Sequence, residues 1–299
     1  MLLLRRWFWL FWFGWISLWS QNRFSFDSQV QRLDSASEGA FDFVIIGDRT
    51  GVSPDGWAVF DQAVAEINLL RPDFCVMVGD LIEGATDQSA LERQWEEAER
   101  HLAVLESPLF LLPGNHDIPN PRGYAVWNEH IGKTYGSFDF RGCRFLFLNT
   151  EEFQGTGESG FGHRQLAYTE RILADVQRSR LFFLFMHQPA WFGNGTLKTQ
   201  WSSLERSLPP SGTISVAGHL HALAMKKQGG RSFLITGPTG GKLRLERNPA
   251  LGLMQHVTWV AVKNGTYRLA FLEVGRLLPE QTALEAYDRT LKGLLLLKY

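Results

Sequence analysis

Five apolar runs in this chain each end on polar side chains that can bind a metal ion, and this arrangement limits the folds the chain can adopt. The runs are short, rich in Val, Ile, Leu and Phe, and closed by Gly, Pro or polar residues, which is typical of buried strands. Because ligands of α/β sheets bind outside the carboxyl ends of the strands, we expect these polar side chains to lie together. The five ends are Gly47-Asp48, Gly79-Asp80, Gly114 to Asp117, Met186-His187 and Gly218 to His221.

The third of these ends is the most informative single stretch. Leu112 to Ile118 read LPGNHDI, so three polar side chains in a row follow an apolar run. Taken alone, the stretch is typical of a tight turn. A turn does not explain the four other strand ends, however, and the five together favour side chains that face a metal ion and a substrate.

Segments with helical spacing alternate with the first three apolar runs, which predicts an α/β domain with parallel strands between helical layers. The expected helices are Trp57–Leu70, Asp87–Glu106 and Gln165–Gln177. Turn signals at Arg141-Gly142, Gly229-Gly230 and Asn264-Gly265 predict hairpins, with at least four strands after His221. We expect a single domain over residues 38–275, after a polar linker over residues 21–37 and before a C-terminal helix within residues 276–299.

The N-terminus departs most from an average composition. Arg5 and Arg6 precede an apolar, Trp-rich run from Trp7 to Trp19. That run is shorter than the roughly 20 residues that a membrane-spanning helix needs, and it is typical of the apolar part of a secretory signal. We therefore expect export to the periplasm or the extracellular space. Residues 1–20 are either a signal peptide cleaved near Ser20 or a retained N-terminal membrane anchor, and a helix docked on the domain is the remaining alternative.

Composition and charge exclude few functions. The chain has 299 residues, is 44% hydrophobic and 20% charged, and carries a formal net charge of -1. No overall positive field recruits nucleic acid, so no dedicated nucleic-acid binding is expected. The two cysteines, Cys75 and Cys143, lie in apolar runs, where a thiol is typically a small buried apolar group. None of these values indicates an oligomeric state.

The order and spacing of the motifs resemble those of the calcineurin-like metallophosphoesterases, which include the purple acid phosphatases and the class III cyclic-nucleotide phosphodiesterases. The resemblance runs from Phe41 to Val274 and is most specific at Gly114 to Asp117 and Gly218 to His221. It also covers GHRQLAYTERIL, residues 162–173. The fold that it implies is a four-layer α/β/β/α sandwich with its site at the top of two sheets. The activity that it implies is hydrolysis of a small phosphomonoester or phosphodiester by a hydroxide bound to two divalent metal ions.

The resemblance also implies a role for each polar strand end. His116 would protonate the leaving oxygen, and Asp117 would orient His116. Mixed oxygen and imidazole ligands favour Mn, Fe, Zn or Ni. Six side chains would hold the metals: Asp48 and His221 the first, Asn115, His187 and His219 the second, and Asp80 both.

The first motif departs from the family pattern, because Thr50 stands where many members have a histidine ligand. Three alternatives follow: the first metal binds weakly, another residue replaces the ligand, or the site holds one metal. His163 is the candidate replacement, with Glu83 behind it. Arg49 is a candidate contact for a substrate phosphate, because a guanidinium suits that geometry, and a structural role is its alternative. Loop residues 242, 244 and 247 are weaker candidates of the same kind.

Thr50 also leaves a second function open, a non-catalytic protein of the same fold that binds metal or phosphate. A nuclease or a lipid-head-group hydrolase is a third interpretation. The near-neutral charge argues against the nuclease, and the apolar N-terminus favours the lipid substrate.

Overall fold

The computed structural model describes residues 23–34, 39–51, 53, 55–152, 160–176 and 179–287, and two six-stranded sheets form its centre. One sheet has the order β12-β11-β10-β1-β2-β3, and the other has the order β4-β5-β6-β7-β9-β8. The strands of the first sheet are β1 (Phe41–Ile46), β2 (Phe74–Met77), β3 (Leu109–Leu111), β10 (His256–Lys263), β11 (Thr266–Glu273) and β12 (Arg276–Pro279). Those of the second are β4 (Gly136–Phe140), β5 (Cys143–Leu148), β6 (Leu181–Met186), β7 (Thr213–Ala217), β8 (Ala224–Gln228) and β9 (Arg231–Ile235).

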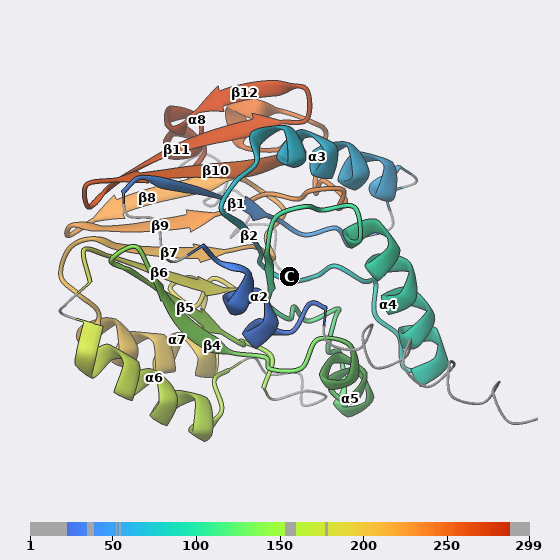
Figure 1. Cartoon of the computed structure of the whole chain (residues 1–299), viewed down its shortest axis with the longest axis horizontal. Coiled ribbons are helices and arrows are strands. Elements are labelled where there is room, and N and C mark those ends of the chain that lie inside the picture. Colours follow the sequence, from blue (N-terminus) through green and yellow to red (C-terminus); the bar gives the residue numbers. More distant parts are fainter. Residues whose placement is uncertain are drawn as a thin grey trace, which may run out of the picture.

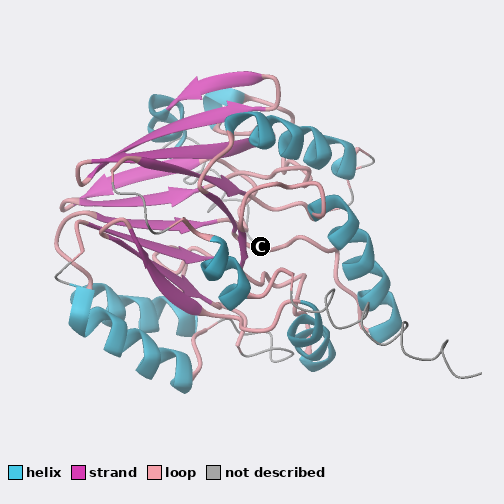
Figure 2. Cartoon of the chain, viewed as in Figure 1, coloured by secondary structure: helices cyan, strands magenta, loops and turns pink. Residues whose placement is uncertain are grey.

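Helices cover the outer face of each sheet (Figure 1). Side chains of α3 (Gly56–Leu70), α4 (Gln88–Leu102) and α5 (Pro121–His130) share an apolar core with β1 and β2. Side chains of α6 (His163–Asp175) and α7 (Gly195–Leu204) share another with β5 and β6. Figure 2 shows the helices outside the paired sheets. The predicted four-layer α/β/β/α sandwich is therefore confirmed.

Aromatic side chains hold the two sheets together. Phe43 and Phe74 stack within the first sheet with ring centroids 4.9 Å apart, and Phe145 and Phe183 stack within the second at 5.0 Å. Between the sheets, Phe43 meets Phe183 edge to face at 5.1 Å. Such pairs add to the stabilisation that burial of the rings gives. The rigid base that results fixes the positions of the loops at the strand ends.

Strand register brings the predicted polar ends to one end of the sandwich. In the first sheet β1, β2 and β3 are parallel, with Ile46 beside Met77 and Met77 beside Leu111. In the second sheet β5, β6 and β7 are parallel, with Leu148 beside Met186 and Phe185 beside Val216. The loops that follow these strands therefore meet above the seam between the sheets.

The linker predicted over residues 21–37 is wrong for its described part. Residues 26–32 form helix α2 (Phe26–Arg32), whose first turn is capped by Ser25. The ring of Phe26 lies 5.3 Å from those of Phe110 and Phe147, so α2 closes the edge between β3 and β4. Burial of that ring outweighs the polar composition of the segment.

The domain also extends past residue 275, where its boundary was predicted. β12 pairs with β11, and helix α8 (Glu280–Ala286) follows, so the described part of the C-terminal helix is short. Helices α5 and α7 were not predicted. The signal or anchor over residues 1–20 lies outside the described residues, and none of the described helices is long and apolar enough to cross a membrane. Both cysteines are free and buried, as expected.

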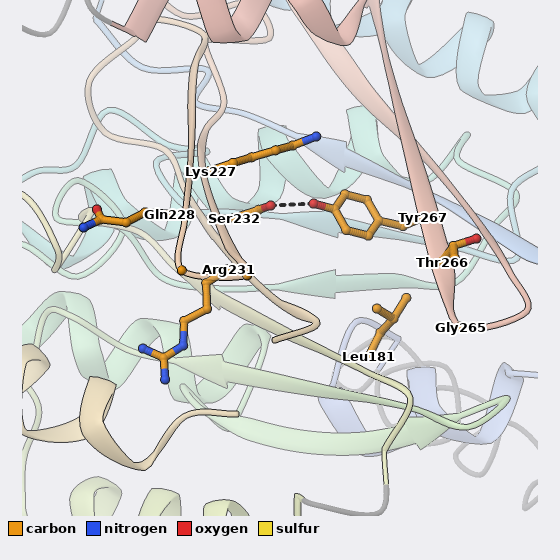
Figure 3. Close-up of a pocket in the computed structure, with 10 residues that line it drawn as sticks. Leu181, Lys227, Gln228, Arg231, Ser232, Gly265, Thr266 and Tyr267 are labelled. Carbon is orange, nitrogen blue, oxygen red and sulfur yellow. Dashed lines mark hydrogen bonds between the residues drawn. The ribbon is translucent and has the colours of Figure 1, made fainter. Parts of the chain in front are cut away.

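A cavity of about 500 Å³ lies beside the amino ends of β6 and β9, at the other end of the sandwich from these loops (Figure 3). Ser232 Oγ and the Tyr267 hydroxyl are hydrogen-bonded at 2.5 Å in its wall. Its cations have protein partners, because Lys227 pairs with Glu280 and Arg231 Nε donates to the Pro209 carbonyl at 2.8 Å. These contacts join the second sheet to β11 of the first sheet and to α8.

Candidate metal centre

Two buried carboxylates form the middle of the site. Asp48 follows β1 and is 0% exposed, and Asp80 follows β2 and is 2% exposed. The backbone of Asp80 has a φ of 58°, a conformation that costs energy for a residue with a side chain. Asp80 Oδ1 accepts a hydrogen bond from the His116 backbone at 2.9 Å, and Asp48 Oδ2 accepts one from the His219 backbone at 2.7 Å. These bonds aim the carboxylates at the space between the sheets.

Side chains from the loops that follow β3, β6 and β7 gather around one side of Asp80. His187 Nε2 lies 3.4 Å from Asp80 Oδ2, 3.1 Å from Asn115 Oδ1 and 3.2 Å from His219 Nδ1. Asp80, His187 and His219 place ligand atoms within 4.8 Å of one another, as a metal ion requires. We call Asp80, Asn115, His187 and His219 the second half-site.

A smaller group lies on the other side of Asp80. His221 Nε2 is 3.3 Å from Asp48 Oδ2, and the ligand atoms of Asp48, Asp80 and His221 also lie within 4.8 Å of one another. We call these three residues the first half-site. Asp80 therefore belongs to both groups, as the predicted bridging role requires.

The residues present fit a pair of divalent cations. Asp48 Oδ1 is buried and has no hydrogen-bond partner among the described residues, although a buried carboxylate oxygen is costly to leave without one. A metal ion would satisfy it. Carboxylate, amide and imidazole donors in one cluster suit first-row transition metals, and three of the six are neutral imidazoles when they bind.

Two glycines make the close approach of these loops possible. A Cβ on Gly114 would lie 2.2 Å from Asp80 Oδ1. A Cβ on Gly79, whose φ is 98°, would lie 2.8 Å from His187 Nδ1. Any side chain at either position would displace a ligand of the second half-site, which explains why Gly precedes these polar residues.

Three imidazoles are oriented by backbone carbonyls, which sequence reasoning missed. The Nδ1 atom of each lies within hydrogen-bond distance of a carbonyl oxygen: His187 with Val78 at 2.9 Å, His221 with Lys242 at 2.5 Å, and His116 with Glu83 at 2.7 Å. An Nδ1–H that donates to a carbonyl leaves Nε2 free to face the centre. No sequence signal marks these carbonyls, because any residue type supplies one.

Burial and charge perturb the pKa values across the site. Burial raises the pKa of Asp48 to about 6 despite the nearby imidazoles of His221 and His187. Burial would also raise the pKa of Asp80, but the charge of His187 and its hydrogen bond hold it below its usual range. Burial lowers the pKa of His187, while Asp80 and Asp48 together raise it to about 10. Burial and the neighbouring His187 lower the pKa of His219 to about 3. Metal binding would therefore release a proton from His187.

Thr50, the predicted departure from the family pattern, is buried beside Asp80. Its side chain is 1% exposed, and its Oγ1 lies 3.4 Å from Asp80 Oδ2. Among the described residues, neither ligand group contains His163 or Glu83. His163 is the exposed first residue of α6, and the Glu83 carboxylate lies 3.1 Å from Arg49 Nη2. The described part of the chain thus favours a first half-site with three side chains over a replaced ligand.

The predicted role of Asp117 requires correction. Its carboxylate accepts four backbone N–H groups, those of Gly114 and of residues 80, 81 and 82, at 2.6 to 3.1 Å. Its own burial and the charge of Asp80 raise its pKa to about 7. Asp117 therefore joins the loops after β2 and β3, whereas the Glu83 carbonyl orients His116. Sequence adjacency misled the prediction, because the side chains of neighbouring residues in a turn diverge.

The Arg49 guanidinium contacts other protein groups and so is not free to bind a substrate phosphate. Its side chain is 10% exposed, its Nε donates to the Leu81 carbonyl at 2.6 Å, and its guanidinium lies 4.3 Å from the ring centroid of Trp57. The Glu83 carboxylate also accepts the Gly51 N–H at 2.9 Å. These contacts favour the structural alternative for Arg49, in which it joins the loops after β1 and β2.

The three weaker cationic candidates differ in whether they contact residues of the site. Lys242 supplies the carbonyl beside His221, and Arg244 Nε donates to the Leu220 carbonyl at 3.2 Å, so both belong to the loop that borders the first half-site. Arg247 pairs instead with Glu273 at 2.5 Å.

The fold and this cluster define the chain as a metallophosphoesterase sandwich. It belongs to the calcineurin-like phosphoesterase family, whose family model matches residues 41–223. The sequence is 37% identical over 98 residues to a serine/threonine-protein phosphatase, CPPED1, of Bos taurus, a match that covers 30% of this chain and 31% of that protein. It is 27% identical over 177 residues to a probable cyclic nucleotide phosphodiesterase of Rhodopseudomonas palustris, covering 53% of this chain and 61% of that one. The chain thus matches only about a third of the length of the CPPED1 relatives.

Solved structures show the same fold at low identity. A dimetal phosphatase from Danio rerio superposes with a TM-score of 0.61 at 14% identity, over 80% of this chain and 98% of that one. GAP50 of Plasmodium, titled the anchor in the inner membrane complex, superposes with a TM-score of 0.56 at 12% identity, over 80% and 86%.

Proposed function

We propose that this chain is a metal-dependent phosphoesterase that acts outside the cytoplasm on a small phosphomonoester or phosphodiester. The observation that carries the proposal is the pair of ligand groups that share Asp80, one of which contains a buried Asp48 oxygen without a partner in the described part of the chain. Relatives named as a phosphatase and as a probable cyclic nucleotide phosphodiesterase support the reaction class without selecting the substrate.

The metals are two divalent ions of Mn, Fe, Zn or Ni, and they would supply positive charge for the phosphoryl oxygens and a nucleophile at neutral pH. The chain's own residues hold them in place. The second half-site offers four side chains and the first offers three, so we expect the ion of the first half-site to bind more weakly. Thr50, at the place of a histidine in many family members, accounts for the difference.

His116 is the proton donor in this proposal. Its Nδ1 lies 2.7 Å from the Glu83 carbonyl, which fixes the ring and directs Nε2 away from the protein backbone. An imidazolium held in this way donates its Nε2 proton to the leaving oxygen and keeps its Nδ1–H bond afterwards. General acids of this kind contribute roughly 10²- to 10⁴-fold to a rate.

A non-catalytic protein that binds metal or phosphate is the second candidate, and Thr50 is the observation that favours it. The two candidates make opposite predictions about turnover. If the first half-site does not hold a metal ion, the protein would bind metal or phosphate without turnover. If both half-sites hold an ion, it would hydrolyse phosphoesters.

The experiment measures metal content and hydrolysis on the same sample. The full chain is purified in detergent without chelators, re-equilibrated with Mn, and assayed with 4-nitrophenyl phosphate and bis(4-nitrophenyl) phosphate. Two ions per chain with metal-dependent turnover would support the phosphoesterase, and bound metal without turnover would support the binding protein. The variant Asn115→Ala should lose activity, whereas Asn128→Ala, a matched change on the exposed face of α5, should not. An unchanged rate in Asn115→Ala would show that the site is wrong.

A further inference from the structure

We propose that the end of the domain remote from the metal centre lies against an anionic lipid bilayer, so that the metal centre faces away from the membrane. The described part of the chain exposes four large apolar side chains: Leu69 by 83%, Leu70 by 42%, Val104 by 59% and Leu245 by 54%. The first three form one group, which we call the Leu69 patch.

The patch comes from two segments, the end of α3 and the turn after α4. Leu69 and Leu70 end α3, and Val104 follows α4. The Asn68 side chain joins the two segments, because its Nδ2 donates to the Val104 carbonyl at 2.8 Å and its Oδ1 accepts the Glu106 N–H at 3.0 Å. The two segments that carry the three apolar side chains are therefore adjacent at this end of the domain.

The apolar N-terminal run joins the domain beside this patch. Arg23 is the first described residue, and its Nη2 donates to the Ala103 carbonyl at 3.0 Å, one residue from Val104. Trp19 ends the apolar run four residues earlier, and four extended residues reach at most about 14 Å. A run rich in Trp suits the interface between lipid and water. Wherever this run enters a bilayer, the Leu69 patch lies within a few residue lengths of that bilayer.

The charges around the patch favour anionic lipid. Arg71 follows Leu70 directly, Arg100 lies one helical turn before Val104, and both are exposed. No ion pair involves either of them among the described residues. Among the described residues the carboxylates beside the patch are the exposed Glu106 and the half-buried Glu66, one helical turn before Leu70. The exposed Arg23 and Arg32 also lie here, because they donate to the Ala103 and Glu106 carbonyls, so positive charge exceeds negative. Apolar side chains with a basic border are typical of surfaces that rest in the headgroup region.

The orientation follows from the direction of the strands. Arg71 precedes β2, which runs toward Asp80, and the four residues of this strand cover about 13 Å along its axis. The metal centre follows the carboxyl end of β2, so it lies at the opposite end of the sheet from the patch. If the proposed function holds, its substrate is a water-soluble phosphoester that arrives from the aqueous side, and the lipid-head-group interpretation is disfavoured.

The test compares labels at the two ends of the domain. The full chain is reconstituted in vesicles of phosphatidylcholine and phosphatidylglycerol, with an environment-sensitive fluorophore on Leu69→Cys, Val104→Cys or Leu245→Cys. The native Cys75 and Cys143 are 0% and 2% exposed and do not compete for the label. We expect nitroxide-labelled lipid to quench the labels at 69 and 104 but not the label at 245, which lies in the loop that borders the first half-site.

Three results would overturn the proposal. Quenching at 245 and not at 69 would reverse the orientation, and no quenching at any position would remove the surface contact. A label at 69 that is shielded in detergent and insensitive to nitroxide lipid would mean that the N-terminal run or a second copy covers the patch. Combining Arg71→Gln and Arg100→Gln should weaken the contact with anionic vesicles, by roughly fivefold for each charge. None of these readouts depends on catalysis, so a failure of the proposed function leaves them unaffected.

Discussion

The two half-sites share Asp80 but differ in what holds their other ligands. In the second half-site, His187 Nε2 lies within 3.4 Å of three other ligand side chains. In the first, His221 approaches Asp48 at 3.3 Å, and Thr50 adds only a hydroxyl 3.4 Å from Asp80. In the second half-site, four ligand side chains, including His187, converge. The first half-site has only three ligand side chains.

Backbone hydrogen bonds hold the loops of the first half-site in place, although they add no metal ligand. The Asp48 carbonyl accepts the Thr239 N–H at 2.9 Å, and the Thr50 carbonyl accepts the Lys242 N–H at 2.9 Å. Arg49 and Glu83 tie the same segment to the loop after β2. The loops of the first half-site are therefore held by contacts within the protein, independently of a metal ion.

Replacing the shared ligand should have the largest effect. In Asp80→Asn the side chain keeps its size and tolerates the positive φ, but both half-sites lose a negative ligand. We expect the rate to fall by at least about 10³-fold, because metal ions supply several kcal/mol of transition-state stabilisation. Metal analysis should show loss from both half-sites. Asp55→Asn, an exposed change with no side-chain cap bond, is the control, and full metal content in Asp80→Asn would contradict the shared role.

The buried His256 behind the first half-site should make stability depend on pH. Burial lowers its pKa to about 4, from a value near 6.5 in an unfolded chain. The folded state therefore binds fewer protons than the unfolded state between these pH values, so the free energy of unfolding falls as pH drops from about 6.5 to 4. The loss attributable to His256 should be roughly 2–3 kcal/mol.

Urea unfolding of metal-free protein at several pH values would measure this loss. His256→Leu should reduce the decrease by about the amount that His256 contributes, whereas substitution of the exposed His163 should leave the decrease unchanged. Because the His256 carbonyl accepts a bond from Thr239 at 2.6 Å, acid should disturb the support of the first half-site directly. Identical pH profiles for His256→Leu and the parent chain would refute the argument.

An imidazole at position 50 should reduce the difference in metal affinity between the two half-sites. In Thr50→His we expect the weaker of two metal-binding steps to tighten by at least about tenfold, since even groups that only orient a ligand change affinity by about 10- to 100-fold. Thr50→Val keeps the shape without a ligand and should leave that step unchanged. Titration of metal-free protein with Mn would follow both steps, and tightening of the stronger step alone would contradict the assignment of Thr50 to the first half-site.

Sequence was sufficient to predict the parts of the molecule that follow from strand pattern. Each apolar run that ended on a polar residue became a strand of a sheet, and its end reached the metal centre, as with Asp48 and His187. The alternation of strands and helices predicted parallel strands between helical layers, whereas the four-layer arrangement was implied by the resemblance to the metallophosphoesterases. These features are local in the chain and need only the general rule that parallel strands meet at their carboxyl ends.

The missed features depend on contacts between distant segments. Helix α2 exists because Phe26 fills the edge between β3 and β4, which no local pattern announces. Helix α5 carried a readable signal, an Asn120 cap followed by Pro at the first position, but Gly123 interrupts its pattern. The carbonyls that orient the imidazoles and the four N–H groups on Asp117 are backbone partners, so residue identity could not reveal them.

The smallest expected effect tests whether the first half-site also influences the proton donor. Glu83 connects the loop after β1 with His116. Its carboxylate binds Arg49 and the Gly51 N–H, and its carbonyl lies within hydrogen-bond distance of His116 Nδ1. In Arg49→Met the carboxylate loses its charged partner, so the carbonyl should shift and His116 should lose its alignment. We expect the rate with an alkyl phosphate, whose leaving oxygen needs a proton, to fall roughly fivefold, and the rate with 4-nitrophenyl phosphate to change much less. Metal content should stay at the parent value. An equal loss with both substrates would assign Arg49 to the metal-binding loop alone and would separate the two half-sites from the proton donor.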